Sequence, residues 1–190
     1  FDMVSQTTAQ SGSLNYDGVQ YVSNKKLDAD VTMAMNLEKM LFTFKDNKVK
    51  LNDFPATFQG TIGLPNATDI VYDLTFKALE TDFKNILSLV PGAYNEQFKD
   101  IKADGKVAFD GYFKGVQNDL KMPGYGVNLK IKDGSFQYPA LPERARNINV
   151  DMVVDNPSGF TNNVKVNVKQ FHLDLGKNPI EGQVASEGLA

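Results

Sequence analysis

The sequence contains no cysteine and a single histidine, His172, in 190 residues. The absence of cysteine excludes disulfide bonds, thiolate metal sites and a cysteine nucleophile. One histidine cannot build a multi-histidine metal site, and any Ser-His-Asp triad would have to include His172. We therefore expect a protein that is not an enzyme and that uses no metal or other cofactor.

Long apolar runs and basic clusters are also missing. No apolar run approaches the ~20 residues that a membrane-spanning helix needs. A net charge of -3, without a basic block, argues against a nucleic-acid partner. The first residues, Phe1-Asp2-Met3, lack the basic start and apolar core of a signal peptide. Because the chain does not begin with methionine, we expect residues 1–190 to be a single segment of a longer protein, with any export signal or anchor upstream.

The sequence is instead rich in alternating apolar and polar residues. Alternation with a period of two is the signal of a β-strand that buries one face. It recurs over residues 27–37, 70–78, 101–113, 127–131 and 148–154. Strands of this kind form antiparallel sheets with one wet face. The pattern predicts a mainly β fold, either a curved antiparallel sheet or a half-open β-sandwich.

Turn residues and one change of period complete the expected elements. Asp46-Asn47 and Asp133-Gly134 each separate two apolar runs, which predicts a hairpin at both places. Between Thr81 and Pro91 the apolar residues follow a spacing of three and four, with Thr81 as a good N-cap and Pro91 as a stop. This spacing predicts one short amphipathic helix over about 82–90.

An internal repeat links the two halves of the chain. Leu27–Met33 aligns with Ile148–Val154, and Phe58–Ile62 aligns with Ile180–Val184 at nearly the same separation. Residues from about 27 to 64 therefore recur at about 148 to 189. A repeated β-unit predicts a sheet that grows by adding similar strands.

Few residues are candidates for chemistry. His172 shares a strand with apolar neighbours of the opposite parity, so we expect it on the polar face. Asp28 and Asp30 could pair as acid and base or hold a hard cation. The same positions of the alternation also carry Thr32 and Asn36, so we interpret the two aspartates as part of an ordinary wet strand face. Three glycines lie within a strand pattern with no helix after them, so we interpret them as bulges or close backbone contacts and not as a phosphate loop; they are Gly105, Gly111 and Gly115.

The apolar face has two interpretations. It is either the packed core of a sandwich or of a sheet covered by the helix, or a partly open groove for acyl chains or for an apolar segment of a partner. Methionines on this face, Met33, Met35 and Met152, are flexible and suit both.

Several longer stretches have the composition and spacing of a known family. They are Leu74–Ala78, Thr81–Pro91, Lys102–Gly105, Phe109–Gly115, Val127–Pro142 and Ile148–Asp151. With these motifs the chain resembles the AsmA family of Gram-negative bacteria over about residues 20–160. The shared motifs are glycine, phenylalanine, aspartate and proline at strand and turn positions.

This resemblance implies a location and a function. Members of the family are large proteins held in the inner membrane by an N-terminal helix, with a long β-rich periplasmic part, and they are implicated in outer-membrane biogenesis. They are similar to repeating β-groove proteins that carry phospholipids between membranes along an apolar trough. The resemblance therefore implies a periplasmic segment of a membrane-anchored protein involved in lipid transport, and it supplies no catalytic residue. The anchor helix itself is absent from this sequence.

Within this interpretation, alternate strand residues are expected to face lipid. They are Val31, Met33, Met35, Ile70, Leu74, Phe76, Val107, Phe109, Leu129 and Ile131. The alternative function is that of a structural or adaptor module, which binds outer-membrane or other envelope proteins by adding a strand at an open sheet edge.

Overall fold

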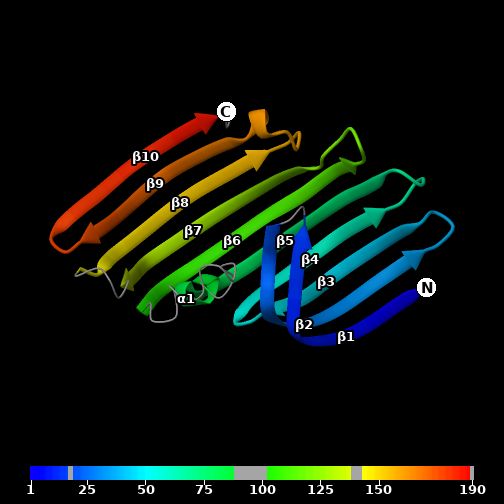
Figure 1. Ribbon diagram of the computed structural model, residues 1–190, viewed down its shortest axis with the longest axis horizontal. Helices are drawn as coiled ribbons and strands as arrows, with labels where there is room; N and C mark the ends of the chain where they lie inside the picture. The colour runs from blue at the N-terminus through cyan, green and yellow to red at the C-terminus, as the bar shows by residue number, and fades with distance from the viewer. Residues whose placement is uncertain (17–18, 88–101, 138–142, 189–190) are drawn as a thin grey trace.

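The computed structural model describes residues 1–16, 19–87, 102–137 and 143–188. Its strands form one antiparallel sheet of ten strands, and each strand pairs with its neighbours in the sequence, from β1 at one edge to β10 at the other (Figure 1). This sheet is open and curved, which confirms the predicted mainly β fold. The strands described here do not form a second sheet facing the first.

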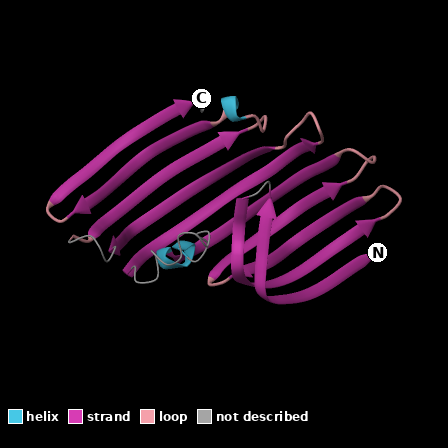
Figure 2. Ribbon diagram, in the orientation of Figure 1, coloured by secondary structure: helices cyan, strands magenta, loops and turns pink. Residues whose placement is uncertain are grey.

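The strand boundaries follow the predicted segments, with longer strands than the sequence indicated. The strands are β1 (Asp2–Tyr16), β2 (Val19–Asn36), β3 (Leu41–Leu51), β4 (Phe54–Gly63), β5 (Ile70–Asp82), β6 (Lys102–Gln117), β7 (Gly124–Gln137), β8 (Ala145–Asn156), β9 (Lys165–Leu175) and β10 (Asn178–Glu187). The helix α1 (Phe83–Leu87) lies within the predicted range of 82–90, whose residues 88–90 are outside the described residues. A short 3-10 helix, η1 (Thr161–Asn163), lies between β8 and β9 (Figure 2).

Charged side chains on one face fix how the strands pair. Asp73 on β5 lies directly opposite Lys114 on β6, and their side chains form an ion pair of 2.9 Å. Lys130 on β7 lies opposite Asp151 on β8 in the same way, at 3.6 Å. Directly opposite residues point to the same side of a sheet, so these pairs define a polar face. The alternate residues form the apolar face.

Two predicted hairpins are wrong, because both sites are β-bulges within continuous strands. β3 continues through Asp46, which has a φ of 49°, and β7 continues through Asp133, which also has a φ of 49°. At each site the register shifts by one residue. The left-handed conformation that suggested a turn here accommodates an extra residue in the strand instead. At each bulge the apolar positions of the sequence move from one parity to the other. The extra residue compensates for this change, so the apolar side chains before and after it lie on the same face.

The sheet is one layer thick over most of its area. The accessible surface is 12324 Å², whereas a compact monomer of 21.0 kDa would have about 9,000 Å². The least exposed apolar side chain is that of Val107, at 1%, on the part of the sheet where α1 packs on β5 and β6. Beside it, the Asn85 amide donates to the Thr81 hydroxyl at 2.9 Å and joins the helix to β5.

Of the three glycines interpreted as bulges or close contacts, Gly105 lies at a register shift between β6 and β7 and Gly111 makes a close backbone contact, whereas Gly115 does neither. Gly105 and Gly115 have φ values of 110° and 131°. Gly111 lies opposite Phe76, and a Cβ at Gly111 would lie 2.3 Å from the carbonyl oxygen of Gly126 and 2.6 Å from the Phe76 ring. The phenylalanine ring therefore uses the space that a side chain at Gly111 would fill.

Replacing Gly111 by alanine tests this packing. We expect Gly111→Ala to lower the free energy of unfolding by about 1–3 kcal/mol, because the strands or the Phe76 ring must move. Gly182→Ala is the matched control, since a Cβ there meets nothing within 4 Å, and we expect little change or a small gain. Urea unfolding measures both. Equal stability of the two variants would contradict the close contact at Gly111.

Candidate functional site

The ten residues predicted to face lipid lie on four strands. Val31, Met33 and Met35 are on β2, Ile70, Leu74 and Phe76 on β5, Val107 and Phe109 on β6, and Leu129 and Ile131 on β7. β5, β6 and β7 are neighbours, whereas β3 and β4 separate β2 from β5. The predicted set is therefore two groups on one sheet, and the residues between them decide whether it forms one surface.

Pairing across the sheet joins the two groups on one face. Met33 lies opposite Phe44, Phe44 opposite Gly60, and Gly60 opposite Leu74. From β5 onward, Leu74 lies opposite Phe113 on β6. Because opposite residues share a face, this row carries the apolar face from β2 to β6 without a gap.

The same face extends to the other edge of the sheet. Phe109 lies opposite Leu129, Leu129 opposite Met152, and Met152 opposite Val168 on β9. Val168 then pairs with Val184 on the edge strand β10. The apolar face thus crosses nearly the whole sheet.

The burial of these side chains shows that the face is only partly covered. Val107, near α1, is buried, and the other nine predicted residues are half-buried. Rings on this face pack against each other, as in the stack of Phe54 on Phe109 at 5.2 Å and the edge contact of Phe76 with Phe109 at 6.0 Å. Side chains in a single layer shield one another only laterally, so apolar area remains available to a ligand.

Several residues of this face were outside the predicted set. They are Phe42, Phe44, Phe58, Ile62, Phe113, Val150, Met152, Val168 and Phe171. The bulge at Asp46 conceals the pattern in β3, because Phe44 and Val49 share the face although they are five residues apart. Alternation over residues 148–154 was visible in the sequence, but only the pairing of β8 with β7 places those residues beside Leu129 and Ile131.

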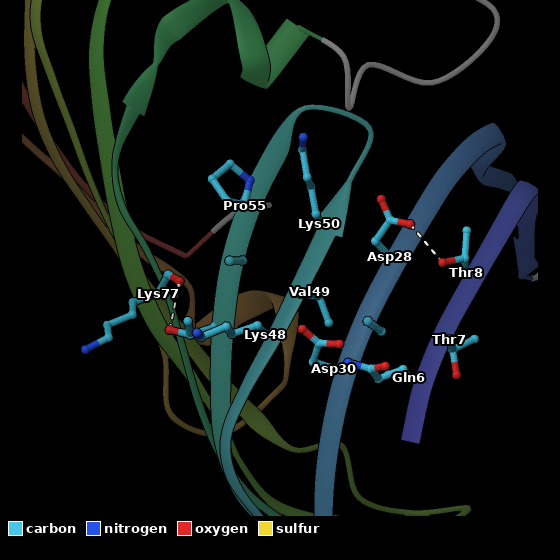
Figure 3. Close-up of a pocket in the computed structure, with 13 residues that line it drawn as sticks. Gln6, Thr7, Thr8, Asp28, Asp30, Lys48, Val49, Lys50, Pro55 and Lys77 are labelled. Carbon is cyan, nitrogen blue, oxygen red and sulfur yellow. Dashed lines mark hydrogen bonds between the residues drawn. The ribbon is translucent and has the colours of Figure 1, made fainter. Parts of the chain in front are cut away.

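The acidic pair Asp28 and Asp30 lines a hollow of about 560 Å³ on β1–β5 (Figure 3). Lysines and threonines line it as well, and none of the ten predicted lipid-facing residues does. The Asp28 carboxylate pairs with the Lys26 ammonium at 3.1 Å and accepts a hydrogen bond from the Thr8 hydroxyl at 3.1 Å. Lys26, followed by Thr8, holds the pKa of Asp28 below its usual value. Such a carboxylate stays ionised and is poorly suited to act as a general acid.

The single histidine lies between carboxylates at the β10 edge. Its Nε2 is 3.3 Å from an Asp174 oxygen, and its Nδ1 is 3.6 Å from a Glu181 oxygen on β10. His172 and Glu181 lie directly opposite each other, as cross-strand partners do. Among the described residues, no group of three or more histidine, aspartate or glutamate side chains could hold a metal ion. The helices of the described chain are too short and too polar to cross a membrane.

Tyr112 joins three strands on the polar face. Its hydroxyl on β6 donates to Asp155 on β8 at 2.5 Å, across Gly126 on β7. A Cβ at Gly126 would lie 2.3 Å from the Tyr112 ring, so the glycine makes room for this bridge. The hydrogen bond to Asp155, with burial and the carboxylate charge, raises the pKa of Tyr112 to about 12.

This shift predicts an alkaline dependence of stability. Below the ordinary tyrosine pKa of 10.0 the hydroxyl is protonated in both states, so the contribution of the bond is complete. It is lost as the pH rises from 10.0 towards about 12, where the folded protein also loses the proton. In absorbance titrations, Tyr112→Phe should lack the one tyrosine whose pKa lies above the ordinary value. The free energy of unfolding of this variant should also fall less steeply than that of the wild type between pH 10.0 and about 12. A wild-type protein whose tyrosines all titrate near 10 would refute the bridge.

Comparison with known proteins assigns neither a family nor a function to the chain. No family model, no curated protein and no solved structure matches the chain. The functional argument therefore depends on the half-exposed apolar face and on the edges and ends of the sheet that carries it.

Proposed function

We propose that this chain is a non-enzymatic β-groove segment that shields or conducts phospholipid acyl chains along its apolar face. It would act as a periplasmic part of an AsmA-like protein, anchored in the inner membrane by a segment outside this sequence, in outer-membrane biogenesis. One observation carries the proposal: the apolar face is continuous across the sheet, and nine of its ten predicted residues are only partly buried.

The chemistry of this face suits an alkyl chain. Its side chains are aliphatic and aromatic, so they offer an acyl chain contact area without requiring polar groups in return. Each methylene group moved from water onto such a surface contributes roughly 0.8 kcal/mol. Met33, Met35 and Met152 can adjust to chains of different shape. Ion pairs on the other face keep that side in water.

A second candidate function is supported by the edges of the sheet. β1 and β10 each pair on one side only, and every described side chain of β10 is exposed. Of the 15 residues of β1, only Asp2 is charged, and the strand contains no lysine or proline. Natural edge strands are usually protected by charge, proline or short length. An adaptor that adds a strand from an envelope protein at β1 would use this unprotected edge.

The groove proposal predicts that one charge on the apolar face abolishes lipid retention. Met33→Asp should lower the lipid retained by protein purified without detergent at least about tenfold, because an ionised carboxylate on the face repels alkyl chains. Thr32→Asp is the matched control, since it places the same charge on the neighbouring residue of β2, exposed on the polar face. Native mass spectrometry and binding of phosphatidylethanolamine with a fluorescent acyl chain measure the effect.

Met33 is a better test position than Phe109, which stacks on Phe54 and contacts Phe76. Circular dichroism and urea unfolding should show that Met33→Asp remains folded. If this variant unfolds, the face is a closed core at that point. A folded variant that keeps its lipid contradicts the groove as well.

The strand-addition candidate makes a separate prediction. Val4 is exposed on the edge strand β1, and Val4→Lys should weaken self-association or partner-strand binding about fivefold, corresponding to about 1 kcal/mol. Val71→Lys is the control, because Val71 is exposed on the same face of the central strand β5. Sedimentation velocity over a wide range of protein concentration compares the variants. If Val4→Lys and Val71→Lys weaken association equally, the association does not use the β1 edge.

A further inference from the structure

The connections at one end of the sheet carry exposed apolar side chains. Because consecutive strands are antiparallel, the loops at 37–40, 64–69, 118–123 and 157–164 all lie at the same end (Figure 1). Three of these four loops present large apolar residues to solvent, and we call these residues the loop rim. The loop rim consists of Leu37, Met40, Leu120, Met122 and Phe160. Leu120 is 84% exposed, and the other four are between 39% and 55% exposed.

Asparagine side chains hold each of these loops in place. The Asn36 side-chain oxygen accepts from the Lys39 amide at 3.0 Å, and the Asn118 side-chain oxygen accepts from the Leu120 amide at 2.9 Å. The buried Asn156 amide donates to the Phe160 carbonyl oxygen at 3.1 Å. Such bonds hold the backbone of each loop in the conformation in which its apolar side chains are exposed. The exposure of the loop rim is therefore built into the turns.

The opposite end of the sheet has a different character. Its described turns consist of Asn52-Asp53, between β3 and β4, and Gly176-Lys177, between β9 and β10. Glu143 and Arg144, which precede β8, lie at this end too. Where the structure describes them, these turns are polar. Among the turn residues described at this end none is a large apolar residue, although Leu175, the last residue of β9, is exposed beside one of these turns.

The spacing of the tips favours a lipid surface over a protein groove. Strands lie about 4.8 Å apart, so the loop at 118–123 is about 19 Å from the loop at 37–40 and about 10 Å from the loop at 157–164. Apolar tips this far apart can each enter one extended lipid interface, whereas a protein would need a matching pocket for each. We propose that the loop rim inserts into the interfacial region of a phospholipid bilayer, so that this end of the sheet contacts the membrane.

The charges beside the tips define how this binding should behave. Glu38 and Lys39 are neighbours in one loop, and Asp119 and Lys121 flank Leu120 in another, so the positive and negative charges balance. Attraction to anionic lipid is therefore small, and burial of the apolar tips supplies the affinity. Binding should persist on neutral phosphatidylcholine vesicles and at raised salt concentration.

Flotation of the whole chain with phosphatidylcholine vesicles tests the proposal. The double variant Leu120→Ser with Phe160→Ser should lower the bound fraction at least about tenfold, because two inserted side chains are lost. The control replaces two exposed apolar residues at the opposite end of the sheet, Leu175→Ser with Ile180→Ser, and should bind as the wild type does. Because all four side chains are exposed, circular dichroism and urea unfolding should be unchanged.

Three results would overturn the proposal: a wild-type protein that stays with the soluble fraction, a double variant that floats normally, or binding that needs anionic lipid and vanishes with salt. The proposal depends on the loops and not on the apolar face, so it can be tested apart from the groove. Met33→Asp should still float, and the double variant should still retain lipid in detergent-free preparations. Loss of lipid retention therefore does not prevent the measurement of vesicle binding, and loss of vesicle binding does not prevent the measurement of lipid retention.

Discussion

Register between neighbouring strands is the constraint on which the rest of this structure depends. A sheet of one layer separates apolar from polar side chains only while every strand keeps its phase, since a slip of one residue moves a whole strand's apolar set to the other face. Directly opposed charges such as Asp73 with Lys114 and Lys130 with Asp151 oppose such a slip on the polar side. Each exposed pair contributes little to stability. Together they make the wrong register unfavourable, because like charges or unpaired charges would meet across several strands.

The bulges allow long strands to keep this separation while the sheet curves. At Asp46 the extra residue leaves the Thr32 amide without its expected partner in the ladder, and the Asn47 side-chain oxygen accepts from it at 2.6 Å. The Asn47 side chain is buried, and its amide nitrogen finds no hydrogen-bond partner within the part of the chain that the structure describes. An unsatisfied buried amide is unfavourable, so this bulge costs stability locally. It is compatible with the fold because it keeps Phe44 and Val49 on one face and adds local twist.

The sequence was sufficient for the fold class and for strands in which alternation is unbroken, such as 70–78 and 127–131. It failed at Asp46 and Asp133, because the same left-handed preference serves a turn and a bulge and only pairing distinguishes them. The register in which the strands pair could not be predicted from the sequence either. The separation that aligns Phe58 with Ile180 in the repeat also aligns Leu51 with Leu173. However, Leu51 lies opposite Phe54, whereas Leu173 lies opposite Ile180, because the turns that follow the two leucines begin at different points. The loop rim could not be predicted from the sequence, because its residues are far apart along the chain and only the strand order brings them to one end of the sheet.

The two ends of the apolar face differ, which gives the proposed groove a direction. At the end where α1 packs, Val107 is buried and the face is covered. At the loop-rim end, Met35 and Ile70 are only partly buried and lie at the ends of their strands, next to the loops at 37–40 and 64–69. A sheet seated on a bilayer by the loop rim would bring this open end of the face to the membrane and keep the covered end away from it. An acyl chain leaving the bilayer would then meet apolar side chains before it met the polar face. The proposed groove and the proposed membrane contact, argued from different residues, are therefore compatible with one orientation of the molecule.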